Sequence, residues 1–299
     1  MGPNILQRKK MKILLIIFVS VITLFAMEPL VGAKWLQEAQ NDKSVVIIDV
    51  SDAKLFEKEH IPGSLNSPIS KWREKHDNYL LVKNANAIQK EFSALGINKE
   101  SKVLVYSHHN NAKDILKVSY VLWAMEYYGF SNSAMLDGGL PAWKKNNGTL
   151  STTTKTVKNG DFKVAKNDAL VADLAFVKEQ IGKSNMIDAR PPVFYFGAQK
   201  QPVLTKAGHI PKAHSYFWKY SFEGDYLKSK NVLKEILVKG MGFDPQKPMI
   251  TYCTGGLETS MNFFVLHRIL GFDNIRLYDA SMKEWGNNSD TPMVKYRWE

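Results

Sequence analysis

Hydrophobic residues in this chain form short continuous runs, and longer amphipathic segments separate these runs. Examples of the short runs are residues 45–48, 103–106 and 249–252. A strand buried on both faces of a parallel sheet has this uninterrupted apolar character, whereas the segments between the runs show the spacing of helices that face a core. The pattern predicts an α/β fold in which parallel sheets are flanked by helices. In such folds, sites form at the carboxyl ends of the strands.

The same set of landmarks occurs twice along the chain and in the same order. The pairs are Asp49 and Asp188, His60 and His209, Ser107 and Cys253, Phe130 and Phe272, Asp137 and Asp279, and Trp143 and Trp285. Chance does not keep so many landmarks in register, so the sequence predicts a duplicated domain. We expect one copy in residues 34–149 and the other in residues 169–299. Residues 150–168, rich in Thr, Lys and Asn, are predicted to be the linker.

The N-terminal segment is typical of a signal peptide. Its basic residues are Arg8, Lys9, Lys10 and Lys12. An uncharged run over 13–25 follows, and Val31-Gly-Ala33 offers small residues for cleavage before Lys34. We therefore predict a signal peptide over residues 1–33, outside the fold, and an exported protein in the periplasm or another extracytoplasmic compartment. An uncleaved membrane anchor stays open, although the run is shorter than the ~20 residues that span a bilayer. A start at Met11 also stays open.

The net charge of +11 at pH 7 is spread over lysines along the chain. These lysines form no block interleaved with aromatic residues, so the charge favours small anions and argues against a nucleic-acid partner. The histidines are scattered, and no Cys/His spacing fits a set of metal ligands. We expect neither a metal nor a cofactor.

Cys253 is the only cysteine, which excludes an internal disulfide and draws attention to its thiol. It stands between the apolar run 249–252 and a loop that leads into a helical segment. The loop residues are Thr254, Gly255, Gly256, Leu257, Glu258 and Thr259. Backbone N–H groups of such a loop favour an anion, so we expect them to lower the thiol pKa from about 8.5 toward neutrality. The pattern indicates a nucleophile; an inert buried cysteine is the alternative.

The chain resembles the tandem-domain rhodanese family, the thiosulfate and 3-mercaptopyruvate sulfurtransferases. The matching motifs are Asp188-Ala-Arg190, Gly208-His-Ile-Pro211, the loop from Cys253 and the tail 284–292. The resemblance implies two rhodanese-like domains, of which the C-terminal one is catalytic. The N-terminal domain is inactive, because Ser107 replaces the cysteine and a hydroxyl cannot carry a sulfane sulfur.

The chemistry implied by the resemblance is ping-pong sulfur transfer. The Cys253 thiolate takes sulfur from a small sulfur-containing anion, such as thiosulfate, 3-mercaptopyruvate or polysulfide, and holds it as a persulfide. A thiophilic acceptor, namely cyanide, a thiol or a protein thiol, then removes the sulfur. The resemblance also implies that Asp188 and Arg190 order the wall of the site. For Arg190, a structural ion pair and a substrate role both stay open.

Three residues depart from the family pattern. Thr254 follows the cysteine where thiosulfate enzymes have a basic residue, and Phe194 stands where relatives have an arginine that holds the anionic donor. Glu258 adds a negative charge at the rim, which opposes a dianion and raises the thiol pKa. We therefore expect sulfurtransferase activity with poor use of thiosulfate.

Two rival functions remain to be weighed. A phosphatase of this fold needs an arginine at the sixth position after cysteine, but Thr259 stands there and the next arginine is Arg268. A non-catalytic binding or sulfur-carrier module is the second alternative, which the intact glycine loop disfavours. His60 and His209 occur in both copies, so we expect them to form structural hydrogen bonds rather than to act in catalysis.

Overall fold

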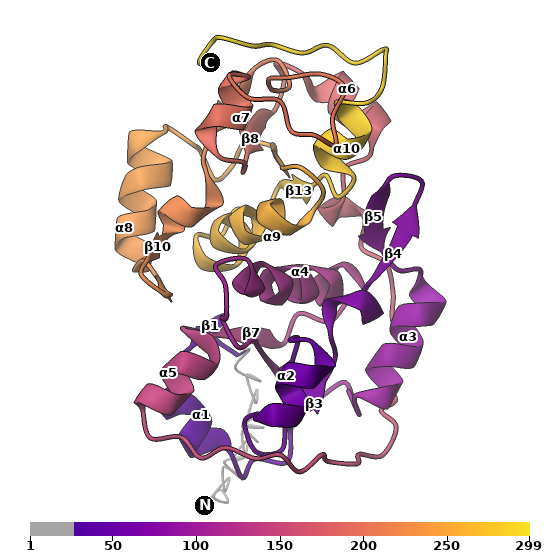
Figure 1. Ribbon diagram of the computed structural model, residues 1–299, viewed down its shortest axis with the longest axis vertical. Helices are drawn as coiled ribbons and strands as arrows, with labels where there is room; N and C mark the ends of the chain where they lie inside the picture. The colour runs from indigo at the N-terminus through magenta and orange to yellow at the C-terminus, as the bar shows by residue number, and fades with distance from the viewer. Residues whose placement is uncertain (1–26) are drawn as a thin grey trace, which may run out of the picture.

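The computed structural model describes residues 27–299 as two α/β lobes, one above the other (Figure 1). The first domain, in indigo and magenta, forms the lower lobe, and the second, in orange and yellow, forms the upper lobe. Helices α4 (Asp114–Tyr127) and α9 (Leu257–Phe263) pack against each other between the two lobes. The fold is thus the predicted pair of α/β domains, joined along two central helices.

The first domain is built on a five-stranded parallel sheet in the order β1-β7-β6-β2-β3. Its strands are β1 (Leu30–Val31), β2 (Val45–Asp49), β3 (Leu65–Asn66), β6 (Lys102–Tyr106) and β7 (Ser133–Leu136). The other helices are α1 (Ala33–Ala39), α2 (Ala53–Lys58), η1 (Ile69–Lys71), α3 (Ala85–Ala94) and α5 (Gly139–Lys145). A separate antiparallel hairpin, β4 (Arg73–His76) and β5 (Tyr79–Val82), projects from this domain toward the second.

The second domain has a four-stranded parallel sheet in the order β13-β12-β8-β9. Its strands are β8 (Asn185–Asp188), β9 (Ala213–Ser215), β12 (Met249–Tyr252) and β13 (Ile275–Leu277), with a small hairpin of β10 (Phe222–Glu223) and β11 (Tyr226–Leu227). Its other helices are η2 (Asp168–Leu170), α6 (Leu174–Gln180), α7 (Pro192–Phe196), η3 (Trp218–Ser221), α8 (Lys230–Lys234) with its continuation η4 (Glu235–Gly240), η5 (Phe264–Ile269) and α10 (Ser281–Trp285).

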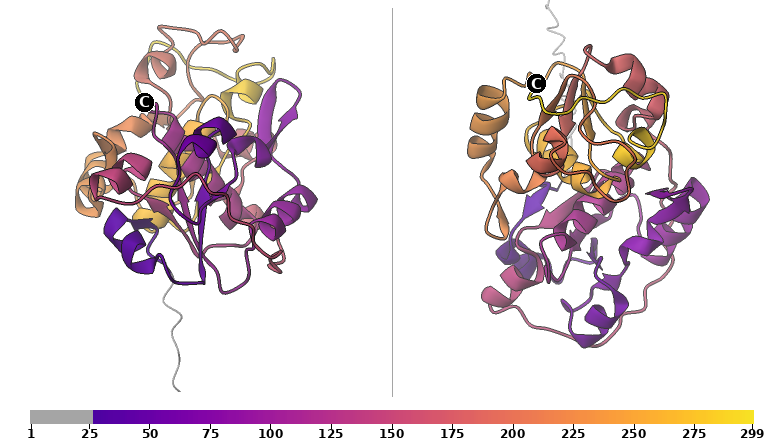
Figure 2. Two further views of the ribbon diagram at one scale, coloured as in Figure 1. Left: turned by 60° about the horizontal axis from the view of Figure 1, so that its bottom comes forward. Right: turned by 45° about the horizontal axis from the view of Figure 1, so that its top comes forward.

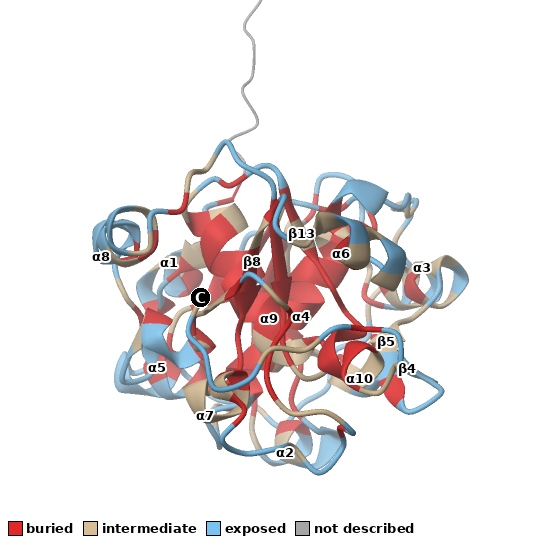
Figure 3. Cartoon of the chain, turned by 90° about the horizontal axis from the view of Figure 1, so that it is seen from above, coloured by how far each residue is buried: buried red, intermediate tan, exposed pale blue. Residues whose placement is uncertain are grey.

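The core runs through the middle of the molecule and across the domain boundary. Figure 3 shows α4, α9 and the central strands buried, whereas α3, α6 and α8 expose their outer faces. Helix α4 is buried on nearly all sides because it lies between its own sheet and α9, and such helices are apolar all round. The hydroxyls of Ser119 on α4 and Ser260 on α9 form a hydrogen bond of 2.8 Å across this contact.

The prediction that residues 1–33 lie outside the fold is wrong for residues 27–33. Strand β1 pairs with β7, joining Leu30 to Met135. Met27 is buried, and its N–H donates to the side-chain oxygen of Asn132 at 2.9 Å. Leu30 and Val31, which the prediction places in the signal peptide, therefore form an edge strand of the first sheet. The basic and uncharged parts of the predicted signal peptide, residues 1–26, lie outside the described residues.

Residues 152–167 form neither helix nor strand and follow the outside of the first domain into the second (Figures 1 and 2). Hydrogen bonds fix this path, for example from the Gly160 N–H to the Ser93 carbonyl at 2.8 Å and from Phe162 to Ile97 at 3.1 Å. The segment is thus a linker held against the first domain. Within residues 27–299, no helix is long and apolar enough to cross a membrane.

The paired histidines have the structural role expected of them. His60 forms a hydrogen bond of 2.7 Å between Nδ1 and the Phe56 carbonyl and stacks on the Phe56 ring. His209 does the same with Tyr195, at 2.9 Å to its carbonyl and 3.8 Å between ring centroids. Each histidine thereby ties the turn that leads into β3 or β9 to the helix before it, α2 or α7.

Candidate active site

Cys253 lies at the carboxyl end of β12, an inner strand of the second sheet. Its side chain is almost fully buried, with 1% relative exposure, at the bottom of a cavity of about 580 Å³. Helix α9 begins at Leu257, so the short loop between strand and helix surrounds the sulfur. This is the strand–loop–helix position that the sequence predicts for the nucleophile.

The turn after Cys253 requires glycine at position 256. Gly256 has φ of +92°, and a Cβ there would lie 2.1 Å from Oδ1 of Asp279. This conformation directs the Gly256 N–H toward the Cys253 Sγ, at 3.2 Å. At Gly255 a Cβ would meet the flexible stem of Lys283 at 3.3 Å, which is a milder conflict. The loop therefore brings backbone donors to the sulfur because a side chain is missing where it turns.

Ser281, which the sequence analysis missed, supports the same loop. Its Oγ accepts a hydrogen bond from the Cys253 N–H at 3.0 Å and donates to the Tyr278 carbonyl at 2.6 Å. Ser281 is fully buried and has a φ of +54°, which is uncommon for a residue with a side chain. Its backbone is thus held in a costly conformation that places a hydroxyl behind the cysteine.

The prediction that the loop lowers the thiol pKa toward neutrality is wrong. Burial, and to a lesser extent the charge of Glu258, raise the pKa of Cys253 to about 12. The N–H groups of Thr259, Gly255 and Gly256 act in the opposite direction but do not outweigh these causes. The sequence shows the donors of the loop, whereas it does not show how deeply the thiol is buried.

Glu258 is half-buried on the first turn of α9 and lines the cysteine cavity. Burial raises the pKa of its carboxyl, as does the nearby Asp188, while Lys113 opposes the shift. Next to it, Thr254 is held by Gln201, whose amide donates to the threonine hydroxyl at 2.8 Å. The carboxyl group of Glu258 therefore lies beside the cysteine, as expected. The hydrogen bond from Gln201 to Thr254 could not be expected from the sequence.

Asp188 and Arg190 form a buried ion pair beside the loop. Asp188 ends β8 and pairs in register with Tyr252, one residue before the cysteine. The Arg190 guanidinium donates to Oδ2 of Asp188 at 2.5 Å and to the Gly208 carbonyl at 2.7 Å. Arg190 is 1% exposed and does not line the cysteine cavity. In the structure Arg190 thus forms a structural ion pair with Asp188, while its role toward the substrate stays a prediction.

The remaining predicted residues fall into two groups. Phe194 from α7 lines the cavity, as do the loop residues Cys253, Thr254, Gly255, Leu257 and Glu258. Thr259 instead lies buried within α9 and contributes its N–H to the sulfur. The aromatic ring therefore occupies the cavity wall at the place where relatives were expected to have an arginine.

The most important residue missed from the sequence is Arg73, on β4 of the first domain. Its Nη2 donates to the Gly255 carbonyl at 2.7 Å and to the Leu80 carbonyl at 2.6 Å, and it lies 3.5 Å from Oδ1 of Asp279. The guanidinium also lies over the Tyr120 ring, 4.5 Å from the centroid. The first domain thus holds the catalytic loop of the second through a buried cation.

Arg73 is also a wall residue of the cysteine cavity. Its side chain is 5% exposed, and neither Nε nor Nη1 forms a hydrogen bond with the residues that the structure describes. Lys113 and Lys283 line the same cavity. Lys206, another basic residue of the second domain, does not line this cavity, because its ammonium is bound to the carbonyls of Asn288 and Thr291. The cavity therefore has basic side chains despite Phe194.

The corresponding loop of the first domain does not direct backbone donors at its serine. Ser107 is fully buried, and its Oγ has no hydrogen-bond partner in the part of the chain described. The next residues run through His109, which has a φ of +52°, and α4 begins only at Asp114. Across residues 27–299, no group of three or more His, Cys, Asp or Glu side chains is placed to hold a metal ion.

Comparison with known proteins identifies the family. A model of the rhodanese-like domain matches residues 32–146 and again residues 173–288. The chain belongs to the rhodanese-like family. The two matches confirm the tandem arrangement inferred from the repeated landmarks, with Cys253 in the second rhodanese-like domain.

Relatives resemble this rhodanese over nearly its whole length. A putative thiosulfate sulfurtransferase from Saccharopolyspora erythraea is 30% identical, over 89% of this chain and 96% of its own. The sulfur carrier protein TtuD from Thermus thermophilus is 28% identical, over 91% and 98%. Among solved structures, the 3-mercaptopyruvate sulfotransferase SseA from Escherichia coli has a TM-score of 0.74 at 24% identity, covering 85% of this chain and 99% of its own.

Proposed function

We propose that Cys253 carries the sulfur in this protein, which is a sulfurtransferase of the rhodanese family. The observation that supports this role is the Gly256 N–H at 3.2 Å from Sγ, in a loop whose cavity opens beside the thiol. A persulfide is an anion, so a sulfur that accepts backbone hydrogen bonds stabilises it as well as the thiolate.

The reaction follows from the position of the thiol. Once Cys253 has lost its proton to solvent, the thiolate attacks the sulfane sulfur of the donor. The bond between that sulfur and the rest of the donor breaks, and the remnant leaves with the bonding electrons. An acceptor then attacks the outer sulfur of the persulfide, and the electron pair of the sulfur–sulfur bond returns to Sγ.

The donor is proposed to be a small sulfur-containing anion. Arg73, Lys113 and Lys283 line the cavity, against the single carboxylate of Glu258. This balance favours an anionic donor even though Phe194 replaces the expected arginine. Poor use of thiosulfate stays a prediction, because Phe194 and these three basic side chains line the same cavity.

Mass measurement after exposure to thiosulfate, 3-mercaptopyruvate and polysulfide tests this function. We expect the protein to gain the mass of one sulfur, which a thiol or cyanide then removes. Protein with Cys253→Ser should gain none. A sulfur adduct that persists in this variant would contradict the proposal.

The likeness to a sulfur carrier protein supports a second candidate function. A carrier would deliver its persulfide to one protein acceptor, whereas an enzyme turns over with small acceptors. Multiple turnovers with cyanide or a small thiol would favour the enzyme. Only one discharge per loaded protein with small acceptors, together with repeated transfer to a protein thiol, would favour the carrier.

We also propose that the protein is exported, on the basis of the basic and uncharged residues before Met27. Because β1 is part of the first sheet, we expect any cleavage to occur before Leu30 rather than before Lys34. N-terminal sequencing of the extracytoplasmic fraction tests both points. A mature protein that begins at Lys34 would contradict the assignment of β1.

A further inference from the structure

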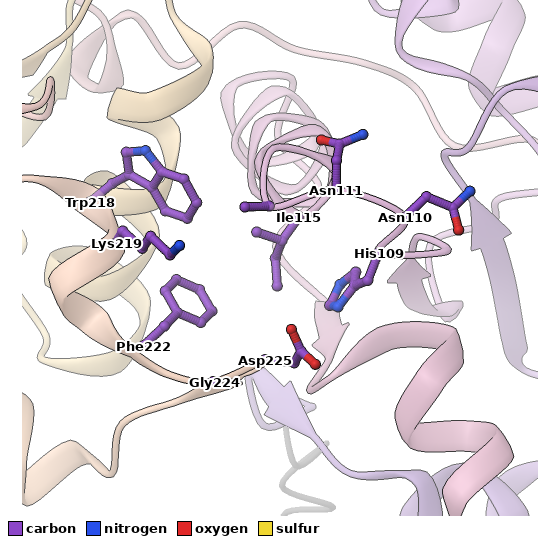
Figure 4. A pocket seen from close by; sticks show the side chains of 10 residues that line it. His109, Asn110, Asn111, Ile115, Trp218, Lys219, Phe222, Gly224 and Asp225 are labelled. Carbon is purple, nitrogen blue, oxygen red and sulfur yellow. The ribbon is translucent and has the colours of Figure 1, made fainter.

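A second cavity of about 580 Å³ adjoins the cysteine cavity. The two share Ala112 from the first domain and Trp218 and Lys219 from the second as wall residues. We call it the interdomain cavity, because His109 and Ile115 on one side face Phe222 and Asp225 on the other (Figure 4). Cavities of ~300–1,000 Å³ are typical of sites for small organic ligands, so this space exceeds what an inorganic donor requires.

The walls of the interdomain cavity combine apolar surfaces with two opposite charges. Ile115, Trp218 and Phe222 provide the apolar part, and Trp218 is buried. Figure 4 shows the Lys219 ammonium and the Asp225 carboxylate directed into the space between the domains. A ligand that matches both groups carries a carboxylate and an ammonium on a small organic body.

The turn that carries Asp225 is fixed in place by the first domain. The N–H of Leu227 on β11 donates to Oδ1 of Asp137 at 3.0 Å. Tyr226 lies so close to Gly138 that a Cβ on this glycine would come within 2.7 Å of its ring. The β10–β11 hairpin thus spans the domain boundary, and the Asp225 carboxylate belongs to an anchored wall rather than to a free loop.

We propose that the interdomain cavity binds the non-reacting part of a zwitterionic thiol acceptor, an amino-acid thiol or a short peptide thiol. This inference rests on the proposed persulfide at Cys253. The acceptor's ammonium pairs with Asp225 and its carboxylate with Lys219, while its sulfur passes the shared wall at Trp218 into the cysteine cavity. There the acceptor thiolate, its proton lost to water, attacks the outer sulfur of the persulfide. The product is an acceptor persulfide, and Cys253 recovers its thiolate.

The test is acceptor selectivity, measured as ratios of KM within each protein variant. The acceptors are cysteine, cysteamine (ammonium only), 3-mercaptopropionate (carboxylate only) and cyanide. With Asp225→Asn, the KM for cysteine and cysteamine should rise about fivefold relative to 3-mercaptopropionate, as for the loss of one partly exposed charge pair. With Lys219→Gln, cysteine and 3-mercaptopropionate should weaken relative to cysteamine.

Two residues outside the cavity serve as controls: Glu223 on the β10–β11 hairpin and Lys228 directly after it. Glu223→Gln changes an exposed carboxylate and Lys228→Gln a half-buried ammonium; neither residue lines either cavity, so both variants should leave the ratios unchanged. Turnover with every acceptor but unaltered ratios in Asp225→Asn and Lys219→Gln would overturn this inference alone. Failure of the unmodified protein to turn over with any acceptor, cyanide included, would instead refute the proposed function.

Discussion

The loop after Ser107 and the loop after Cys253 occupy equivalent places in two copies of one domain, yet only the second surrounds a sulfur with donors. Both follow the end of an inner parallel strand and lead into a helix of the domain contact. The second turns through Gly256 directly into α9, whereas the first runs on to Asp114 before its helix begins. The strands and helices are preserved by packing, while the loop is preserved only where chemistry requires it.

The first domain, which lacks the cysteine, makes direct contacts with the cysteine loop of the second. Its β4 strand places Arg73 against the Gly255 carbonyl, and its Val82 N–H and Tyr120 hydroxyl donate to Oδ2 of Asp279 at 2.8 and 2.7 Å. Asp279 in turn occupies the space that a side chain at Gly256 would need. The first domain therefore fixes the geometry of the loop that carries the cysteine in the second.

The strongest test of the difference between the two loops is to substitute Cys253 and Ser107, the residues at their starts. Cys253→Ser should lower sulfur transfer by roughly three orders of magnitude or more, because a hydroxyl forms no persulfide. Ser107→Ala should leave transfer within about twofold of the unmodified protein. Ser107→Cys should add a thiol that takes no sulfur from the donor, as peptide mass spectrometry can show. Sulfur found on residue 107 of this variant would mean that the loop of the first domain can also stabilise a persulfide.

The next largest effect should come from removing the cross-domain cation. Arg73→Ala leaves Asp279 buried without its ion-pair partner, which should lower the free energy of unfolding by about 3–5 kcal/mol. We also expect kcat to fall, because the Gly255 carbonyl loses its donor. Urea unfolding and steady-state kinetics measure the two effects.

An exposed ion pair provides the control for Arg73. Lys239→Ala removes the partner of Glu235 on the surface of the second domain and should cost less than ~1 kcal/mol. Arg73→Lys keeps the charge but loses the planar fork, so its stability and kcat should lie between those of Arg73→Ala and the unmodified protein. Equal stability and turnover in all three variants would show that the first domain does not position the loop.

A third prediction concerns the anionic donor. Adding Phe194→Arg to a variant with Glu258→Gln should lower the KM for thiosulfate by about ten- to a hundredfold, since a charge-assisted hydrogen bond contributes ~1.5–3 kcal/mol. The KM for a neutral or monoanionic donor should change less. Efficient use of thiosulfate by the unmodified protein, with no gain from the double substitution, would indicate that Arg73 and the lysines already supply the cation.

The smallest effect expected is a displacement of the pH profile. Burial and the charge of Glu258 raise the pKa of Cys253 to about 12, so transfer through the thiolate should increase with pH across the neutral and alkaline range. Glu258→Gln removes the charge that contributes to this rise, and the increasing limb should move to lower pH, with a several-fold faster rate at fixed pH. Glu258→Asp, which keeps a carboxylate, is the control. An unmoved profile in Glu258→Gln would show that Glu258 does not act on the thiol.

Much of the fold and the cysteine loop could be predicted because their signals are local. Continuous apolar runs indicate buried parallel strands, and a cysteine followed by two glycines indicates a tight turn at a strand end. The start of the first domain was predicted wrongly, because Leu30 and Val31 look alike as the end of a leader and as an edge strand.

The supporting residues could not be predicted because their partners are remote in sequence. Arg73 and Gly255 are separated by 182 positions, and nothing around Arg73 distinguishes it from a surface arginine next to a tryptophan. The direction of the Cys253 pKa shift failed for a related reason. Donors can be inferred from a glycine loop, but the loss of water around the thiol depends on both domains together.

The contact from Arg73 to Gly255 also bears on whether the two halves of the chain can be separated. The first domain has a serine where the second has its cysteine. Here its deletion would remove the guanidinium that reaches the Gly255 carbonyl and the hydroxyl and amide that hold Asp279. The copy with the thiol thus depends on contacts from the copy without one, so separating the two halves would leave the cysteine loop without its outer support.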